Sequence, residues 1–232
     1  FLKIWYTRFN QLNESEDIKM DILETMKARH SVRQYKNQAI ESSKREKINA
    51  LIKDVNAESK LSIQVFYDEP KCFDSFMAHY GKFENVKNYI AIVGNKNDQE
   101  KAGYYGEKIV LKCQKLGLNT CWVAMTHGKS KAQIKRGQKL LIIISLGYGE
   151  TQGVPHKSKS IAELGQADQK NEWFEKGMEA VSLAPTAVNQ QKFYFELKNG
   201  IVTAKNLGGF YSRIDLGIVK YHFEAVTGHE VK

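Results

Sequence analysis

The chain has 232 residues, of which 42% are hydrophobic and 26% are charged. This length and composition predict one folded domain or two closely merged small ones, and exclude a disordered chain or a short peptide. The 35 Lys and Arg residues against 26 Asp and Glu give a net charge of +9, which favours anionic partners such as phosphates, nucleotides or nucleic acid.

The cysteines and the first residues bear on location. Cys72, Cys113 and Cys121 form no CxxC pair, so we interpret them as reduced and the protein as cytoplasmic. No apolar stretch reaches about 18 residues, so no membrane contact is expected. Residues 1–19 lack a signal-peptide pattern, and we interpret them as an N-terminal extension, of the kind an expression vector supplies, before a natural start at Met20. Residues 20–232 are then a single domain.

Apolar periodicity predicts the first elements. A short helix is expected over 18–29, followed by a basic loop. Ser42 or Ser43 can cap the next helix, whose apolar residues recur at i, i+3, i+4 and i+7. The β-rich runs 61–67 and 89–95 predict strands, and the second has the unbroken apolar character of a central strand.

The rest of the chain continues this mixture. The later elements expected are a helix over 99–116, a strand over 119–125, a helical turn over 132–137, a mid-sheet strand over 139–149, a helix from near Trp173 that ends before Pro185, strands over 192–197 and 201–206, and a helix over 211–227. Because there is no regular βαβ alternation, we predict an α+β fold with a mixed, mainly antiparallel sheet covered by helices on both faces.

Two basic segments are candidates for anion binding. In RHSVRQY, Arg29, Ser31 and Arg33 would face one way if the segment is extended, which makes a clamp for an anionic ligand; the alternative is a solvated basic loop. In HKSK, Lys157 and Lys159 share a side in the same manner, and by themselves they are more typical of plain surface.

The remaining motifs give weaker or negative indications of a functional site. The LAPTAVNQQ loop offers small residues together with the amides of Asn189 and Gln191, which suits the approach of a flat ligand but also an ordinary turn. The glycines of 147–153 lack the spacing and the following helix of a dinucleotide-binding loop. The six histidines show no metal-ligand spacing, and no nucleophile motif is present, so neither a metal site nor hydrolysis is predicted.

Taken in order, RHSVRQY, LGLNTCWVA, the apolar strand leading to PHKSK, and APTAVNQQ resemble the nitroreductase family of FMN-dependent flavoproteins, in a divergent subgroup of short members. The resemblance covers most of the chain from Met20 onward. It implies a nitroreductase-like α+β fold, an FMN cofactor, NAD(P)H as co-substrate, and a homodimer that builds its FMN sites at the interface. The helices near Gly106 and Tyr211 offer apolar faces for such a dimer.

The resemblance also assigns roles to residues. Arg29 and Ser31 match the positions that hold the FMN phosphate, and His30 contributes mainly backbone. Arg33 matches the cation near flavin N1 and O2, where negative charge gathers on reduction, and a backbone N–H near Ala124 is placed to bond N5; these two are the catalytic candidates. The remaining cofactor-binding candidates are Trp122, Val123 and Met125 along the ring, Lys157 and Lys159 on the phosphate, and Pro185, Thr186, Asn189 and Gln191 in the late loop.

One departure concerns that late loop. In most of the family the AP[ST]AxNxQP segment follows the first amphipathic helix, whereas here residues 55–64 hold that place and the motif appears at 184–191, with Lys192 instead of the usual proline. The loop can therefore reach the flavin from the same chain or from the partner.

The function expected is an FMN-dependent oxidoreductase that transfers a hydride from NAD(P)H through flavin N5 to a nitroaromatic, quinone or similar small-molecule acceptor. One alternative is a flavin-binding sensor or store without turnover, which needs the same site. A basic nucleic-acid-binding module is less supported, because no RRM, KH or OB signature is present and the cations are dispersed, so no nucleic-acid partner is expected. Acceptor specificity would depend on loops such as 71–87.

Overall fold

The computed structural model describes residues 21–232, so the expected extension over 1–19 and the first residues of the helix expected over 18–29 lie outside it. The first part of the chain forms α2 (Ile22–Ala28), α3 (Ser42–Ser59), β1 (Ser62–Phe66), the 3₁₀ turn η1 (Pro70–Cys72), α4 (Phe76–Tyr80), β2 (Asn88–Gly94), α5 (Gln99–Lys115), β3 (Asn119–Val123) and β4 (Lys139–Gly147). The second part forms α6 (Ile161–Leu164), β5 (Gly165–Ala167), α7 (Glu172–Ser182), the 3₁₀ turn η2 (Ala187–Asn189), β6 (Phe193–Lys198), β7 (Ile201–Asn206) and α8 (Ser212–Thr227).

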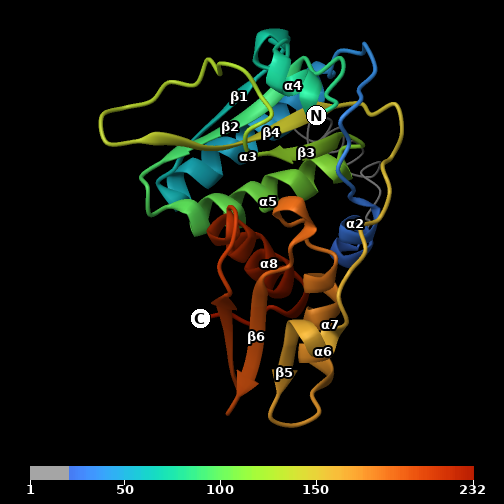
Figure 1. The fold of residues 1–232 in the computed structure, drawn as a ribbon, viewed down its shortest axis with the longest axis vertical. Coiled ribbons are helices and arrows are strands. Elements are labelled where there is room, and N and C mark those ends of the chain that lie inside the picture. The colour runs from blue at the N-terminus through green and yellow to red at the C-terminus, as the bar shows by residue number, and fades with distance from the viewer. Residues whose placement is uncertain (1–20) are drawn as a thin grey trace, which may run out of the picture.

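Strands β1 to β4 form one antiparallel sheet in the order β1-β2-β4-β3. The two strands expected in the middle of a sheet, β2 and β4, do lie there. All residues of β2 and most of β4 are buried, because both faces of the sheet are covered. On one face, Ile90, Ile92 and Ile144 pack with the apolar residues of α3 and α5 (Figure 1).

The opposite face is covered by loops and by the short helix α4. Tyr89, Ala91 and Ile143 point to this side, where they pack with Phe73 and Phe83 from the connection between β1 and β2. Val32 and Tyr35 of the basic segment pack on the same side. The buried Tyr35 hydroxyl contacts the Val32 carbonyl oxygen at 2.7 Å and Ser145 Oγ at 2.8 Å. These contacts fix the basic segment against the sheet.

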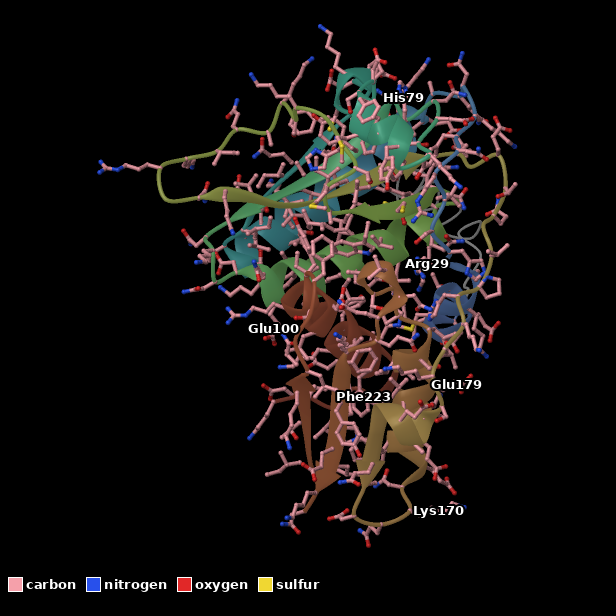
Figure 2. The ribbon with its side chains drawn as sticks, in the orientation of Figure 1. Arg29, His79, Glu100, Lys170, Glu179 and Phe223 are labelled. Atoms are coloured by element: carbon pink, nitrogen blue, oxygen red, sulfur yellow. The ribbon has the colours of Figure 1, made fainter. Side chains whose placement is uncertain are left out.

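The strands after residue 160 form a second sheet, in the order β5-β6-β7, instead of extending the first. The outer edge of β3 is already occupied, because Ser31 forms a parallel bridge with Thr120 and the Val32 N–H donates to the Thr120 carbonyl at 3.0 Å. Figure 1 shows the two sheets at opposite ends of the molecule, and Figure 2 shows Arg29 at the level where the two parts meet.

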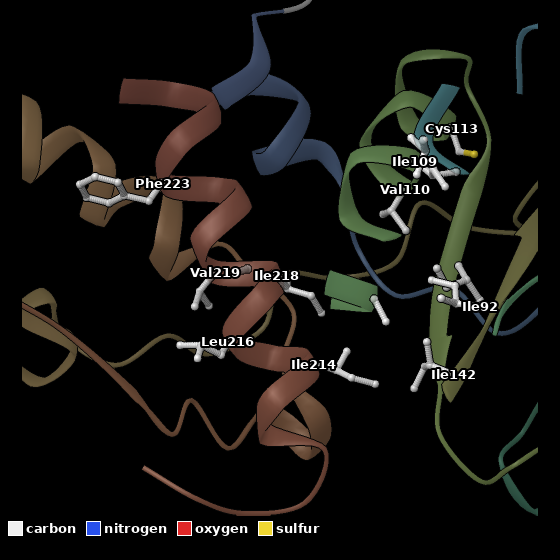
Figure 3. Close-up of a cluster of buried hydrophobic side chains, with 14 of the residues drawn as sticks. Ile92, Ile109, Val110, Cys113, Ile142, Ile214, Leu216, Ile218, Val219 and Phe223 are labelled. Atoms are coloured by element: carbon white, nitrogen blue, oxygen red, sulfur yellow. The ribbon is translucent and has the colours of Figure 1, made fainter. Parts of the chain in front are cut away.

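Helices α5 and α8 join the two parts. A Cβ added to Gly103 of α5 would lie 1.9 Å from the Ile214 carbonyl oxygen, and one added to Gly217 of α8 would lie 1.9 Å from the Glu100 carbonyl oxygen. The two backbones therefore touch where the helices cross, which requires glycine on both sides. Ile214 and Ile218 point from α8 toward the sheet residues Ile92 and Ile142, whereas Phe223 points away into the second part (Figure 3).

Two local predictions are wrong. Ser42 and Ser43 lie inside α3, whose N-cap is Glu41, and neither side chain caps the helix. The helical turn expected over 132–137 is irregular chain, because residues 131–133 are held by other parts of the protein: the Lys131 N–H donates to the Tyr89 hydroxyl and the Gln133 N–H donates to Gln64.

Candidate functional site

A hollow of about 580 Å³ lies between the two parts, within the usual size range of small-molecule sites. We call it the larger hollow. Its walls come from the basic segment, the end of β3, the end of α4, the loop after α7 and the start of α8. The lining residues are Ser31, Arg33, Tyr80, Gly81, Lys82, Cys121, Trp122, Ala124, Met125, Thr126, Ile142, Pro185, Thr186, Ala187, Val188, Phe210, Tyr211, Ile214, Asp215 and Ile218.

A smaller hollow of about 260 Å³ shares part of this lining, including Ser31, Arg33 and Thr186. Arg29, Ser31 and Arg33 all contact it, as expected for an extended segment whose alternate residues face one way. The pairing of Ser31 and Val32 with Thr120 keeps the segment extended. The structure therefore brings together the three residues that the RHSVR motif predicted.

Arg29 is only 3% exposed, and its Nε and one terminal nitrogen have no hydrogen-bond partner. Its Nε lies 3.8 Å from Glu107 Oε1, too far for a hydrogen bond but close enough for charge attraction. Burial lowers the pKa of Arg29, and the nearby Glu107 opposes that shift. A buried guanidinium with unused donors, at the edge of a hollow, is a ready site for an anion.

Two histidines border the smaller hollow. His30 lies in the basic segment, and His156 lies in the HKSK segment, with its Nε2 at 3.1 Å from the Ser182 carbonyl oxygen. Burial lowers the pKa of both rings, and the charge of Arg29 lowers them further. Both histidines therefore favour the neutral form beside Arg29, so the positive charge along this hollow comes from the guanidiniums of Arg29 and Arg33.

The end of β3 supplies part of the larger hollow. Trp122, Ala124 and Met125 line it, and the Ala124 carbonyl accepts a hydrogen bond from the Tyr211 hydroxyl at 3.3 Å. Val123, also expected along the ligand, points to the opposite face of the sheet and is buried there. Its side chain cannot reach the hollow, because successive side chains of a strand alternate between faces.

The loop after α7 forms the facing wall. Pro185 and Thr186 line both hollows, and Asn189 lines the smaller one. Val188 and Asn189 have φ of 47° and 53°, a left-handed conformation that is unusual for a β-branched residue such as valine. The loop comes from the same chain, so a partner subunit is not required to bring it to the site.

Asp215 of α8 holds this loop in place. Its carboxylate accepts hydrogen bonds from the Ala187 N–H at 3.0 Å and from Gln190 Nε2 at 2.7 Å. Asp215 is buried and lines the larger hollow, and burial raises its pKa to about 6 against the lowering effect of those hydrogen bonds. It is therefore a buried acid at the base of the loop.

Besides Val123, three predicted residues lie outside both linings: Lys157, Lys159 and Gln191. Lys159 Nζ donates to the Gln191 carbonyl at 3.2 Å, and the Gln191 side chain accepts from the Lys159 N–H at 2.8 Å and donates to the Lys157 carbonyl at 3.0 Å. The Asn189 side chain also donates to the Lys157 carbonyl, at 2.9 Å. In this structure the amides of Asn189 and Gln191 thus tie the HKSK segment to the late loop.

Sequence reasoning missed several residues of the site: Tyr80, Phe210, Tyr211 and Asp215. Tyr80 lies in the 71–87 loop that was expected to influence specificity, but no motif marks it. Asp215 could have been noticed in the sequence, because it is a charged residue between the apolar residues Ile214 and Leu216 of α8. A carboxylate among apolar helix residues is a candidate site residue, because a buried charge is costly unless it is paired and hydrogen-bonded.

Comparison with known proteins identifies the family. The family model "Putative TM nitroreductase" matches residues 21–227, so the chain belongs to this nitroreductase family. None of the curated proteins compared matches the chain. No helix within residues 21–232 has both the length and the apolar character needed to cross a membrane.

Solved structures confirm the predicted fold. A putative nitroreductase from Thermotoga maritima MSB8 is 24% identical, covers 89% of this chain and 83% of its own, and has a TM-score of 0.66. A putative nitroreductase in complex with FMN from Desulfovibrio desulfuricans is 15% identical, covers 62% of this chain and 95% of its own, and has a TM-score of 0.50. The protein has the α+β nitroreductase fold.

The residues present fit an FMN molecule. The smaller hollow has the unpartnered donors of Arg29 and the hydroxyls of Ser31 and Thr186, which suit a phosphate. The larger hollow has Trp122, Tyr211 and the small residues Gly81 and Ala124, which suit a flat ring. The two hollows share lining residues, so one ligand with an anionic end and a flat end can occupy both.

Proposed function

We propose that the protein is an FMN-dependent oxidoreductase that transfers reducing equivalents from NAD(P)H to a small-molecule acceptor such as a nitroaromatic or a quinone. The observation that carries this proposal is the buried Arg29 guanidinium with two unpartnered nitrogens at the edge of the smaller hollow, which shares lining residues with the larger one. When bound, FMN would supply the redox chemistry by accepting a hydride at N5 and passing it on. The protein would supply binding, orientation and charge.

Arg29 and Ser31 would hold the phosphate in the smaller hollow, with the backbone of His30 beside them. The ring would lie in the larger hollow, along Trp122 and Met125 and near the backbone N–H of Ala124, with Pro185 and Thr186 on the facing wall. Asn189 completes the smaller hollow. Four predicted residues would act without lining the site. Val123 would act through its strand, and Lys157, Lys159 and Gln191 would act through the late loop.

Arg33 is the proposed catalytic cation. It is exposed to both hollows and lies over the Phe83 ring at 5.9 Å, a contact that orients the guanidinium. A fixed cation beside the ring would stabilise the reduced flavin more than the oxidised one. Arg33→Met should therefore lower the midpoint potential of the FMN-saturated protein in a redox titration. An unchanged potential would remove this role.

The proposal also covers the assembly and the location of the protein. A homodimer stays a prediction, but the helices suggested for its interface, α5 and α8, pack on each other within one chain. A dimer that uses these helices would therefore involve the faces that do not pack on each other. Cys72, Cys113 and Cys121 are free and buried, which agrees with the cytoplasmic location we propose. A single FMN-binding domain over residues 20–232 is proposed on the same grounds as the function.

The absorption spectrum of the purified protein tests the cofactor, and anaerobic mixing with NADH or NADPH tests the reaction. We expect flavin bands that bleach on mixing and recover when an acceptor such as a quinone is added. Bands that do not bleach with either nicotinamide would favour the sensor or store. A protein that binds no flavin would contradict the proposed function.

A further inference from the structure

A single buried carboxylate connects the two parts of the molecule behind the smaller hollow. Glu107 of α5 is fully buried, and its Oε2 accepts a hydrogen bond from Trp122 Nε1 at 3.0 Å. Its Oε1 lies 3.0 Å from His222 Nε2 of α8 and 3.8 Å from Arg29 Nε. Glu107 therefore makes its hydrogen bonds with Trp122 and His222, and only a through-space charge contact with Arg29.

The other ring nitrogen of His222 also faces an acceptor. His222 is fully buried, and its Nδ1 lies 2.8 Å from the Ala180 carbonyl oxygen. A carbonyl oxygen cannot donate a proton, so Nδ1 must carry a hydrogen. Nε2 faces Glu107 Oε1, so this contact needs either a hydrogen on Nε2 or a proton on the carboxyl group. The choice depends on the ionisation of Glu107.

The surroundings of Glu107 favour the ionised carboxylate. The Arg29 guanidinium and the Trp122 N–H both approach it, and a positive charge and a hydrogen-bond donor both favour the carboxylate over the neutral acid. Burial alone would raise the pKa of Glu107, but the hydrogen bond from His222 and the charges of His222 and Arg29 lower it overall. With Glu107 ionised, both nitrogens of His222 must donate.

We propose that His222 is a buried imidazolium that keeps Arg29 available for a phosphate. By donating to Glu107 Oε1, it occupies the oxygen that would otherwise close on Arg29, so that Nε and one terminal nitrogen of Arg29, which lines the smaller hollow, stay without partners. The buried group of Arg29, Glu107 and His222 then has a net charge of +1, which an anion can neutralise. His222 acts through Glu107, so it is a positioning residue, and this role rests on the proposed function.

The protonation state can be measured on the unmodified protein, with one variant used to assign the signal. Nitrogen and carbon NMR shifts of the histidine rings distinguish an imidazolium from either neutral tautomer. We expect the flavin-free protein at neutral pH to show one imidazolium among its buried histidines, assigned to His222 because its signal disappears in His222→Gln. A neutral His222 ring would overturn the proposal, whatever the flavin affinity.

The positioning role is tested by comparing FMN with riboflavin, which lacks the phosphate. In His222→Leu, Glu107 loses its partner and should pair with Arg29, so FMN should bind about tenfold more weakly while riboflavin affinity stays the same. His222→Gln keeps one donor and should lose less. His229→Gln is the matched control, because His229 is exposed and stacks on Trp173 away from this cluster. Equal loss for both flavins would overturn the proposal.

The same design separates this inference from the proposed function. If the unmodified protein binds neither flavin, the proposed function fails, and inorganic phosphate becomes the probe. Phosphate that raises the melting temperature of the unmodified protein more than that of His222→Leu would support the role of His222. Equal protection of both proteins would overturn it.

Discussion

The two parts of the chain contain the same order of elements, a helix, an antiparallel pair of strands and a second helix, yet they contribute differently to the site. In the first part this order is α3, β1, β2 and α5, and in the second it is α7, β6, β7 and α8. The second helices of the two parts cross at Gly103 and Gly217, each of which contacts the backbone of the other helix.

The main difference lies between the first helix and the first strand. In the first part residues 60–61 make this connection, with Lys60 in the left-handed conformation. In the second part it extends over residues 183–192 and forms one wall of both hollows. The first part has the cations and the strand end, and the second part has the loop, so neither part contains a complete site.

The largest effect, a loss of unfolding free energy, should come from substitutions that push α5 and α8 apart where the two parts meet. Gly103→Ala and Gly217→Ala each place a methyl group against backbone that cannot move aside, so each should cost about 3 kcal/mol or more of unfolding free energy despite the better helix propensity of alanine. Denaturant unfolding measures this cost. Gly106→Ala is the control, because its Cβ would meet the Trp122 side chain instead of backbone; equal losses at all three sites would contradict the crossing described here.

The second-largest effect is expected on FMN affinity, to which the first part contributes Arg29. Arg29→Ala removes a charged contact of about 1.5–3 kcal/mol, so FMN should bind one to two decades more weakly. Lys157→Met removes a cation that does not line either hollow and should weaken FMN much less. Fluorescence titration measures both affinities. An unchanged FMN affinity in Arg29→Ala would rule out the smaller hollow as the phosphate site.

Asp215 tests the attachment of the loop in the second part. Its pKa rises from 3.8 to about 6 on folding, so between these pH values the folded protein holds a proton that the unfolded chain has released. Stability from this group therefore falls as pH rises toward 6. Asp215→Asn should be more stable than the unmodified protein at pH 7.5 by roughly 1–3 kcal/mol, with the difference shrinking below pH 6. A difference that does not change with pH would contradict the buried acid.

The smallest effect concerns the conformation of the loop itself. Val188 is 84% exposed and has a φ of 47°, so it gains little from burial and pays for a left-handed conformation. Val188→Asn should raise the unfolding free energy by about 0.5–1 kcal/mol, because asparagine tolerates this conformation better. The control is Val154→Asn at another exposed valine, which should change stability little. A loss of stability in Val188→Asn would mean that the side chain has a role in the loop.

Much of the fold could be predicted from sequence. The bounds of α5, β2 and β4 follow from the spacing of their apolar residues. Tertiary packing agrees with that spacing, since these elements face apolar partners on every buried side. The separation into two sheets could not be predicted, because it depends on Ser31 and Val32 occupying the edge of β3 from a distant part of the sequence. The start of α3 was misjudged because serine can cap a helix or lie inside its first turn.

The site was predicted where a motif has a local physical meaning. Alternation in an extended segment correctly grouped Arg29, Ser31 and Arg33 around one hollow. The buried pair of Glu107 and His222 could not be predicted, since the two residues come from different helices and are brought together only by the helix crossing. The sequence also left open which chain supplies the late loop; in the fold, Pro185 and Thr186 line both hollows of their own chain.

We propose that the residues of the two parts together supply one flavin site for each chain. Calorimetric titration of the unmodified, flavin-free protein with FMN tests it most directly. We predict saturation at one FMN per chain, with affinity higher for FMN than for riboflavin because the phosphate contacts Arg29. Saturation at one FMN per two chains, or no binding at all, would contradict the claim.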